Sequence, residues 1–214
     1  MTDAVAWVLA VPVAYLIGAV PVGIALGRLL RGIDIRRYGS GNAGATNVLR
    51  TLGPAAGALV LLADIAKGAA PILLVTLATD EAVIRGTAGA MVVIGHMWPV
   101  WARFRGGKGV ATSIGVVIVL APWAALPASL IGFSLLGITR IVSLASMTGA
   151  IVGTTVLIAL VAFGYYDLGY LVFGISVLIL VPAKHKSNIQ RLLSGTENKL
   201  EEKARPRRVR TRQT

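Results

Sequence analysis

Residues 53–77 read GPAAGALVLLADIAKGAAPILLVTL and contain only two charged side chains, Asp64 and Lys67. A run of about 20 mostly apolar residues is long enough to cross the hydrocarbon core of a bilayer as a helix. Inside lipid, the backbone N–H and C=O groups must be paired within the segment, and a helix achieves this. The stretch therefore predicts a transmembrane helix and an all-α protein.

The composition extends this prediction to the whole chain. Of its 214 residues, 56% are hydrophobic, and the mean hydropathy is +0.77, which is high for a soluble domain. Six further stretches are apolar, so we predict a polytopic integral membrane protein with about seven transmembrane helices. These stretches are residues 5–27, 82–101, 111–120, 123–137, 143–163 and 166–181.

The charges between these stretches predict an orientation. Cations gather in residues 28–50 and 104–108, at Arg140 and in the tail from Lys184, whereas the alternate loops are acidic or neutral. Cytoplasmic loops carry the excess of lysine and arginine, so we expect the amino terminus outside and the carboxyl terminus in the cytoplasm. Arg85 is the one exception. A single helix over residues 111–137 would place Arg140 outside, so we favour a break at Ala121-Pro122.

Several classes of site are excluded by what the sequence lacks. There is no cysteine, which rules out a disulfide framework and a thiol nucleophile, and only His96 and His185 could supply an imidazole. We therefore predict no metal site and no cofactor. The net charge of +12 lies in loops and in the tail rather than on a soluble face, so we predict no nucleic-acid partner.

A polar, glycine-rich stretch, GSGNAGATNVLR, occupies residues 39–50. It fits G-x-G-x-x-G, but no βαβ unit surrounds it, so a dinucleotide fold is not indicated. Glycines let backbone N–H groups approach an anion, and a helix beginning at Thr46 or Asn47 would point its positive end at that anion. A tight loop capped by serine or asparagine explains the stretch about equally well.

A second loop combines glycines with cations, RGGKGVAT at residues 105–112. It is not a Walker A loop, because Lys108 is followed by glycine rather than by serine or threonine. Glycines, a lysine and a helix starting at Thr112 nevertheless suit a phosphate. The alternative is a cationic loop at the membrane edge, but two such loops on one face favour an anion site.

Polar residues elsewhere fall into pairs with helical spacing. Asp64 and Lys67, at i and i+3, share a face of one membrane helix, where they form either a functional group or a structural ion pair. His185, Asn188 and Arg191 are spaced three apart and share one face of any helical turn.

Two residues stand at the ends of apolar stretches. His96 precedes Trp98 and Pro99 and is either an interface anchor or a site donor, and Ser143 opens the sixth stretch. Within each motif we find no pairing of a nucleophile with a base. An acyltransferase built on this sequence would therefore need an activated acyl donor.

Together these motifs resemble those of the bacterial acyl-phosphate:glycerol-3-phosphate acyltransferases of the PlsY type. The resemblance covers residues 5–197. The matching motifs are SGNAGATNVLR (40–50), KGAAPI (67–72), GHMWPVW (95–101), FRGGKGVAT (104–112), RIVSL (140–144) and HKSNIQRLLSGTE (185–197).

The resemblance implies transfer of a fatty acyl group from acyl phosphate to the 1-position of glycerol 3-phosphate, the first step of phospholipid synthesis. The products would be lysophosphatidic acid and phosphate. It also implies seven spans, no metal or nucleotide, and a multi-pass protein of the bacterial inner membrane with its active site facing the cytoplasm. The partners would be the two substrates and membrane lipids; the oligomeric state stays open, and a monomer is compatible with the sequence.

The resemblance also implies the site residues. Arg50 and Lys108 would neutralise phosphate charge, arginine offering a bidentate grip. We assign a catalytic set of His185, Ser143 and Asn188, in which His185 positions the site or relays a proton. The substrate- and phosphate-binding set comprises Ser40, Gly41, Asn42, Thr46, Asn47, Arg50, Lys67, His96, Arg105, Gly107, Lys108 and Thr112. A substrate phosphate would take the hydroxyl proton, so holding both substrates in attack geometry would be the protein's main task.

A different class, a membrane permease for phosphate or an organophosphate, also uses broken helices that point at an anion. The absence of an internal repeat and the placement of all polar motifs on one face argue against it. The sequence predicts one membrane-embedded domain over residues 1–197 and a basic, disordered cytoplasmic tail over residues 198–214. That tail could rest on anionic lipid.

Overall fold

The computed structural model describes residues 3–202, and every regular element in this range is helical, which confirms the all-α prediction. Three short 3₁₀ turns lie between ten α-helices. The turns are η1 (Ile35–Arg37), η2 (Val100–Ala102) and η3 (Leu168–Tyr170). The helices are α1 (Asp3–Gly18), α2 (Val22–Arg31), α3 (Ala45–Leu52), α4 (Pro54–Ala78), α5 (Ala82–Met97), α6 (Val110–Leu120), α7 (Pro122–Thr139), α8 (Val142–Ala162), α9 (Leu171–Lys184) and α10 (Lys186–Leu193).

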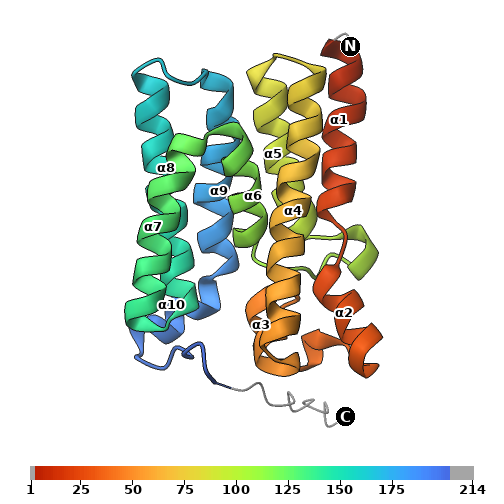
Figure 1. The fold of residues 1–214 in the computed structure, drawn as a ribbon, viewed down its shortest axis with the longest axis vertical. Helices are drawn as coiled ribbons and strands as arrows, with labels where there is room; N and C mark the ends of the chain where they lie inside the picture. Colours follow the sequence, from red (N-terminus) through yellow and green to blue (C-terminus); the bar gives the residue numbers. More distant parts are fainter. Residues whose placement is uncertain (1–2, 203–214) are drawn as a thin grey trace, which may run out of the picture.

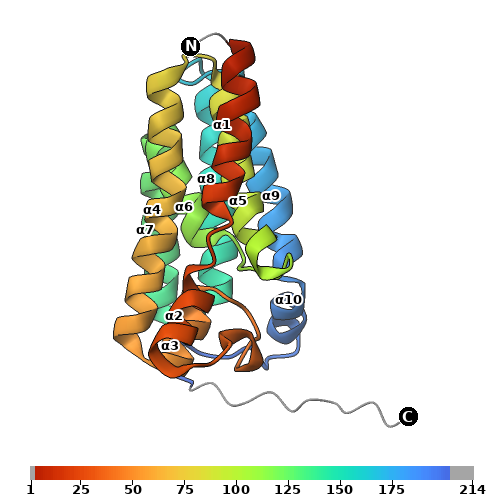
Figure 2. The ribbon, with the colours of Figure 1, turned by 90° about the vertical axis from the view of Figure 1, so that its right-hand side faces the viewer.

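The longer helices stand side by side in one upright bundle (Figure 1). α4 and α8 run through its whole height, whereas α1, α5 and α9 occupy the upper part and end near the middle. The short helices α2, α3 and α10 fill the lower end, as the view turned by 90° also shows (Figure 2). The lower half of the bundle is therefore rich in helix ends and loops.

Prolines end two helices earlier than the sequence predicted. The first stretch, expected as one helix over residues 5–27, is interrupted between α1 and α2 by Pro21. The third, expected to reach residue 101, ends as α5 at Met97 because Trp98 precedes Pro99 and is not helical, with φ −131° and ψ 67°. Proline has no N–H and disfavours helical geometry in the residue before it, so both helices break there.

The other boundaries agree more closely with the sequence. α4 and α8 match the expected helices to within a residue or so, and a break at Ala121 separates α6 from α7 as predicted. α6 begins at Val110 rather than at Thr112. The last stretch, expected as one helix over residues 166–181, begins with the 3₁₀ turn η3 and continues as α9 to Lys184.

Fewer helices qualify as membrane spans than the seven predicted. Within residues 3–202, four stretches are long and apolar enough: Trp7–Arg31, α4, α7 and α8. A fifth is added if η3, α9 and α10 count as one span across a 60° bend. The structure therefore supports a multi-pass membrane protein, α6 is a shorter apolar helix, and α5 stands beside these spans.

Glycines bring α4 and α6 into backbone contact. A Cβ on Gly68 would overlap the carbonyl of Thr112, and a Cβ on Gly115 would overlap the carbonyl of Ile65. Small residues allow this close approach between helices in a membrane, where van der Waals packing drives association. The contact fixes the start of α6, and with it the loop that precedes α6, against α4.

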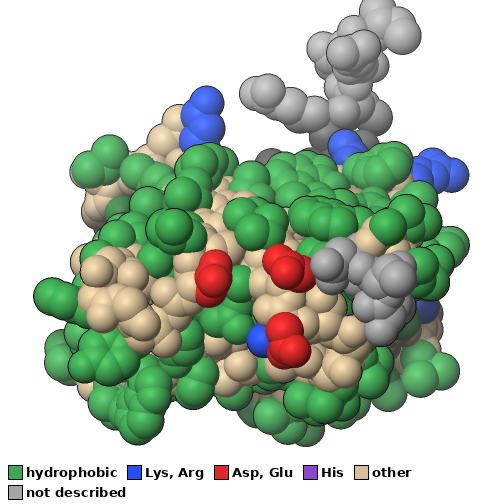
Figure 3. Space-filling model, turned by 90° about the horizontal axis from the view of Figure 1, so that it is seen from above, with side chains coloured by type: hydrophobic (Ala, Val, Ile, Leu, Met, Phe, Trp, Pro, Cys, Tyr) green, Lys and Arg blue, Asp and Glu red, His purple; other side chains and the backbone are tan. Residues whose placement is uncertain are grey.

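The upper end of the bundle carries few basic groups. Seen from above, acidic side chains lie among hydrophobic ones, and a basic group touches one of them (Figure 3). Arg85, the exception to the charge pattern, bonds Asp80 at 2.8 Å and donates to the carbonyls of Thr76 and Thr79. Its charge is compensated locally, which explains why an arginine is tolerated at this end.

Candidate active site

The first glycine-rich loop is held in shape by its own asparagines. Asn47 is buried; its Nδ2 donates to the carbonyls of three residues in the range 35–42, and its Oδ1 accepts from the N–H of Ser40 at 3.0 Å. Asn42 accepts from the N–H of Gly44 at 3.1 Å. Gly41 has a positive φ of 74°, which favours glycine. Both carboxamides thus support the loop, and the side chain of Ser40 remains exposed.

Helix α3 starts at the end of this loop, at Ala45 rather than at Thr46 or Asn47, and no side chain caps it. Arg50, in its last turn, donates from Nη2 to the carbonyls of Asn198 (3.2 Å) and Lys199 (2.7 Å). Its Nε is buried and has no partner among the described residues. Neutral carbonyls hold this guanidinium, so it keeps a donor for an anion.

The start of the predicted tail contacts the bundle. Residues 198–202, which the sequence assigned to a disordered tail, pack against the bundle: the N–H of Leu200 donates to the carbonyl of Arg140, and Glu201 pairs with Arg140 at 3.1 Å. Order in this segment follows from these bonds. The rest of the predicted tail, residues 203–214, lies outside the described residues.

Lys108 lies in the second glycine loop, directly before Gly109 and the start of α6. Its Nζ donates to Oδ1 of Asn188 at 2.6 Å. Burial lowers the pKa of Lys108 to about 8, although the nearby carboxylate of Glu197 acts in the opposite direction. The ammonium is thus poorly solvated and close to neutral amide oxygen, which favours the binding of an anion.

Glu197 accepts hydrogen bonds from two predicted residues, Ser143 and Asn188, and from Arg191. Its Oε1 accepts from Oγ of Ser143 at 2.9 Å and from Nδ2 of Asn188 at 2.6 Å, and its Oε2 accepts from Nε of Arg191 at 2.8 Å. The side chain is 5% exposed. Burial raises the pKa of Glu197, but these hydrogen bonds outweigh burial and hold the pKa below its usual range.

The sequence missed the role of Glu197. It appeared only as the last residue of the matching motifs, and no spacing rule connects it to Ser143, which lies on α8. The prediction that Asn188 and Arg191 share a face is confirmed, since both side chains reach this carboxylate from α10.

His185 marks the bend between α9 and α10. Its imidazole is buried, and Nδ1 lies 2.8 Å from the carbonyl of Val181. In the neutral ring Nδ1 must then carry the proton, which leaves Nε2 as an acceptor. This arrangement suits either role expected for His185, positioning or proton relay.

Arg36, which the sequence did not single out, joins η1, just before the first glycine-rich loop, to the segment that contains the second. Its Nη1 donates to the carbonyls of Ala102 (2.9 Å) and Arg105 (3.3 Å), and Asp34 pairs with its Nη2 at 2.7 Å. The side chain of Arg105 itself is exposed. Arg36 thus fixes the backbone beside the predicted phosphate-binding residues.

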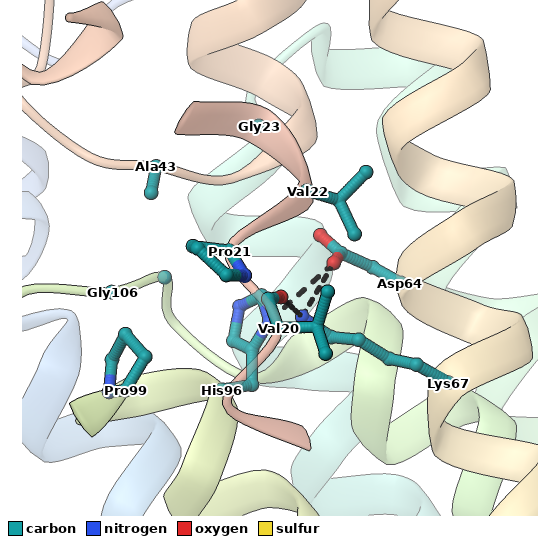
Figure 4. A pocket seen from close by; sticks show the side chains of 11 residues that line it. Val20, Pro21, Val22, Gly23, Ala43, Asp64, Lys67, His96, Pro99 and Gly106 are labelled. Carbon is teal, nitrogen blue, oxygen red and sulfur yellow. Dashed lines mark hydrogen bonds and ion pairs between the residues drawn. The ribbon is translucent and has the colours of Figure 1, made fainter. Parts of the chain in front are cut away.

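A second polar cluster lies around α4 (Figure 4). Lys67 bonds Asp64 at 2.9 Å, which confirms the predicted pair, and also donates to the carbonyl of Val20 at 2.8 Å. Nδ1 of His96 lies 3.6 Å from Asp64, within ion-pair range but too far for a hydrogen bond. The three side chains line a small cleft, and Gly107 is also part of its lining.

Two predicted threonines remain: Thr46 lies half-buried in the first turn of α3, whereas Thr112 is fully buried and its Oγ1 has no partner among the described residues. No group of three or more histidine, aspartate and glutamate side chains in residues 3–202 has the arrangement of a metal site. The site thus offers two cations, hydroxyls, amides and one carboxylate. Such a set binds anionic oxygen and stabilises charge that develops on it.

Comparison with known proteins places this site in context. A family model described as glycerol-3-phosphate acyltransferase matches residues 8–195. The glycerol-3-phosphate acyltransferase of Anaeromyxobacter sp. (strain K) is 45% identical over 199 residues, covering 90% of this chain and 96% of that relative. The enzyme of the same name from Halalkalibacterium halodurans is 46% identical over 198 residues, with 91% and 95% covered.

Two solved structures are similar throughout. Both are crystal structures of PlsY, an integral membrane glycerol 3-phosphate acyltransferase. The glycerol 3-phosphate form has a TM-score of 0.83 at 39% identity, and the lysophosphatidic acid form 0.80 at 38%; each comparison covers 90% of this chain and 94% of the other.

Proposed function

Because this chain belongs to the glycerol-3-phosphate acyltransferase family, we propose that it transfers a fatty acyl group from acyl phosphate to the 1-position of glycerol 3-phosphate. The chain is a membrane acyltransferase, and the products of the proposed reaction are lysophosphatidic acid and phosphate. The observation that carries the proposal is one hydrogen-bonded cluster, in which Ser143 and Asn188 donate to Glu197 and Lys108 donates to Asn188.

The reaction needs no protein nucleophile. The hydroxyl oxygen of glycerol 3-phosphate attacks the acyl carbonyl, the bond from the acyl carbon to the phosphate oxygen breaks, and phosphate leaves with the electron pair. A substrate phosphate takes the hydroxyl proton. The protein binds two phosphates and holds the reacting atoms together, which is the larger part of such catalysis.

The geometry supports a division of roles among the predicted residues. Lys108 and Arg50 neutralise phosphate charge, because one is poorly solvated and the other keeps an unpaired N–H. Ser143 and Asn188 are held by Glu197 and donate hydrogen bonds once a substrate competes with that carboxylate. His185 either positions the site or relays a proton through Nε2.

The remaining predicted residues divide between binding and support. Ser40 and Arg105 can reach a ligand from the two loops and Thr46 from the first turn of α3, and Gly41 and Gly107 let the backbone approach it. Asn42 and Asn47 hold the first loop, whereas Lys67 and His96 belong to the cluster on α4.

We propose that the chain crosses the bacterial inner membrane seven times, with the amino terminus outside and the active site facing the cytoplasm. Support comes from the arrangement of α5, α6 and α9, which stand beside the four longer spans (Figure 1). The seven crossings would then be α1 with α2, followed by α4 through α9. The first basic loop lies at the lower end of this bundle and the second lies below the end of α5, on the side that the positive-inside rule assigns to the cytoplasm (Figure 1).

The test uses the purified protein in detergent with palmitoyl phosphate and glycerol 3-phosphate. We expect release of phosphate together with acylated product. No product, combined with phosphate or organophosphate uptake in proteoliposomes, would overturn the proposal in favour of a permease.

The same assay tests the two cations. Lys108→Ala and Arg50→Ala should each lower turnover by about 100-fold or more, because each removes a charge that stabilises the leaving phosphate. Lys186→Ala removes an exposed cation from α10 and should leave turnover near the wild-type level. Near-wild-type turnover by either Lys108→Ala or Arg50→Ala would refute their assignment.

A further inference from the structure

We propose that Asp64, Lys67 and His96 form a positioning cluster that holds the loop carrying Lys108. The claim that this loop serves acyl transfer rests on the proposed function. The claim that the cluster holds the loop rests on geometry alone.

The first step is the break between α1 and α2. Pro21 has no N–H, and Val20 lies between the end of α1 and the start of α2, so its carbonyl is outside both helical ladders. This carbonyl accepts from Nζ of Lys67 at 2.8 Å and from the N–H of Val22 at 3.1 Å. Irregular backbone at membrane depth is tolerated where protein groups satisfy it. Asp64, one helical turn away on α4, compensates the charge, and the Lys67 and Asp64 side chains are 9% and 3% exposed.

The second step leads from α4 to α5. His96 lies in the last turn of α5 and turns Nδ1 toward Asp64. The opposite edge of the ring packs on Gly107, because a Cβ on Gly107 would overlap Nε2 and Cε1 of His96. The carbonyl of His96 also accepts the N–H of Gly107 at 3.0 Å. Ring and backbone of one residue therefore fix Gly107, the residue directly before Lys108.

The end of α5 is itself anchored from two further helices. The carbonyl of Met97 accepts Nζ of Lys184 from α9 at 2.9 Å, and the carbonyl of Trp98 accepts the hydroxyl of Tyr15 from α1 at 2.9 Å. Met97 also accepts the N–H of Gly106. The loop thus rests on a support that is tied to α1, α4 and α9, and a shift of about 1 Å in such a support can cost about 100-fold in rate.

The first experiment measures loop order without measuring activity. The chain has no cysteine, so Arg103→Cys gives a single site for a nitroxide label on the same exposed loop. His96→Ala should raise the mobility of this label in the electron paramagnetic resonance spectrum. Asp80→Asn breaks an ion pair at the upper end of the bundle and should leave the spectrum unchanged. An unchanged spectrum in His96→Ala would overturn the proposal.

The second experiment couples positions 96 and 107 in the acyl-transfer assay. His96→Ala should lower kcat/KM by about tenfold or more, and Gly107→Ala by about 100-fold, both with melting temperatures near wild type. The methyl group added at position 107 would overlap the ring of His96, and His96→Ala removes that ring. The kcat/KM of the double variant should therefore be no lower than that of Gly107→Ala alone. Losses that multiply would show that the two positions act independently and would overturn the proposal.

A conservative variant covers the case in which His96→Ala does not fold. His96→Asn keeps a nitrogen near Nδ1 for Asp64 but removes the edge that reaches Gly107, so it should fold, loosen the labelled loop and lower kcat/KM. Wild-type activity by His96→Asn would contradict the proposal. An inactive wild-type protein would instead refute the proposed function, while the label still decides whether the cluster holds the loop.

Discussion

At the scale of single residues, the carboxylate of Glu197 organises more of the site than any residue that the sequence singled out. It accepts hydrogen bonds from Ser143 on α8 and from Asn188 and Arg191 on α10. Removal of this carboxylate would leave its three donors without an acceptor, and an unpaired buried polar group lowers the free energy of unfolding. Glu197 should therefore matter for stability as much as for binding.

Glu197→Gln tests this role. The amide keeps the shape but turns a donor toward Arg191 or Asn188, so we expect a loss of about 2 kcal/mol, or roughly 4–8 °C in melting temperature for a chain of this size. Glu201→Gln is the matched control, since Glu201 is 65% exposed and its pair with Arg140 is worth about 0–1 kcal/mol. Equal effects of the two substitutions would contradict the assignment.

The pKa of Lys108 predicts a pH dependence. Burial lowers this pKa to about 8 from 10.5, so the ammonium loses its proton as the pH rises through 8, and kcat/KM should fall there. Stability behaves in the opposite sense: between pH 8 and 10.5 the unfolded chain binds more protons at this position, so this group favours folding increasingly as pH rises.

The control for this prediction is Lys108→Arg, whose guanidinium stays charged throughout this range. The decline above pH 8 should disappear in this variant, whatever its absolute activity. A decline that persists unchanged would assign it to another group.

Local spacing predicted some of these residue contacts and not others. Asp64 with Lys67, and Asn188 with Arg191, lie one helical turn apart, so period alone brings them together. The contact of Asp64 with His96 joins two helices, and no local signal encodes such a distance. For the same reason the sequence could not predict that Asn47, expected to bind a ligand, is hydrogen-bonded to the backbone of Ser40 and Ile35.

At the scale of elements, the contact between α4 and α6 decides where the Lys108 loop can lie. Gly68 and Gly115 let each helix touch the backbone of the other. Composition predicted both helices and their lengths well, because apolar length is a local property. It did not predict that the first apolar stretch breaks, although Gly18 and Pro21 were visible, since proline is tolerated within many membrane helices.

Gly115→Ala should disturb this crossing. The added methyl meets the carbonyl of Ile65, so the helices must separate, at an expected cost of about 1–3 kcal/mol. In Gly137→Ala, on α7, the methyl meets nothing within 4 Å, so this control should be neutral or slightly stabilising. Thermal unfolding in detergent separates the two, and equal melting temperatures would argue against the close contact.

At the scale of the whole molecule, the bundle has two unlike ends. The upper end is hydrophobic and acidic with Arg85 neutralised in place (Figure 3), whereas the first cationic loop and the short helices α2, α3 and α10 lie at the lower end and the second cationic loop lies near mid-height (Figure 1). The charge pattern predicted this asymmetry from the sequence. It could not predict helix lengths below a full span, since protein contacts as well as lipid decide where a helix stops.

Single cysteines in this cysteine-free chain test the orientation. A membrane-impermeant maleimide should label Tyr165→Cys in intact cells, and Leu193→Cys only after the inner membrane is opened. Both native side chains are well exposed, at 74% and 86%, so burial does not limit labelling. The reverse pattern, or cytoplasmic exposure of a reporter fused at Asp167, would refute the proposed topology.

The support beneath the Lys108 loop has an optical consequence. The ammonium of Lys184 lies 4.0 Å from the ring centre of Trp98, and Trp98 is only two residues from His96. The other three tryptophans, Trp7, Trp101 and Trp123, are 41–70% exposed. Once those three are replaced by phenylalanine, the remaining fluorescence comes from an indole under a cation at the edge of the site. Trp98 is therefore an intrinsic fluorescent reporter with which substrate binding can be followed in real time.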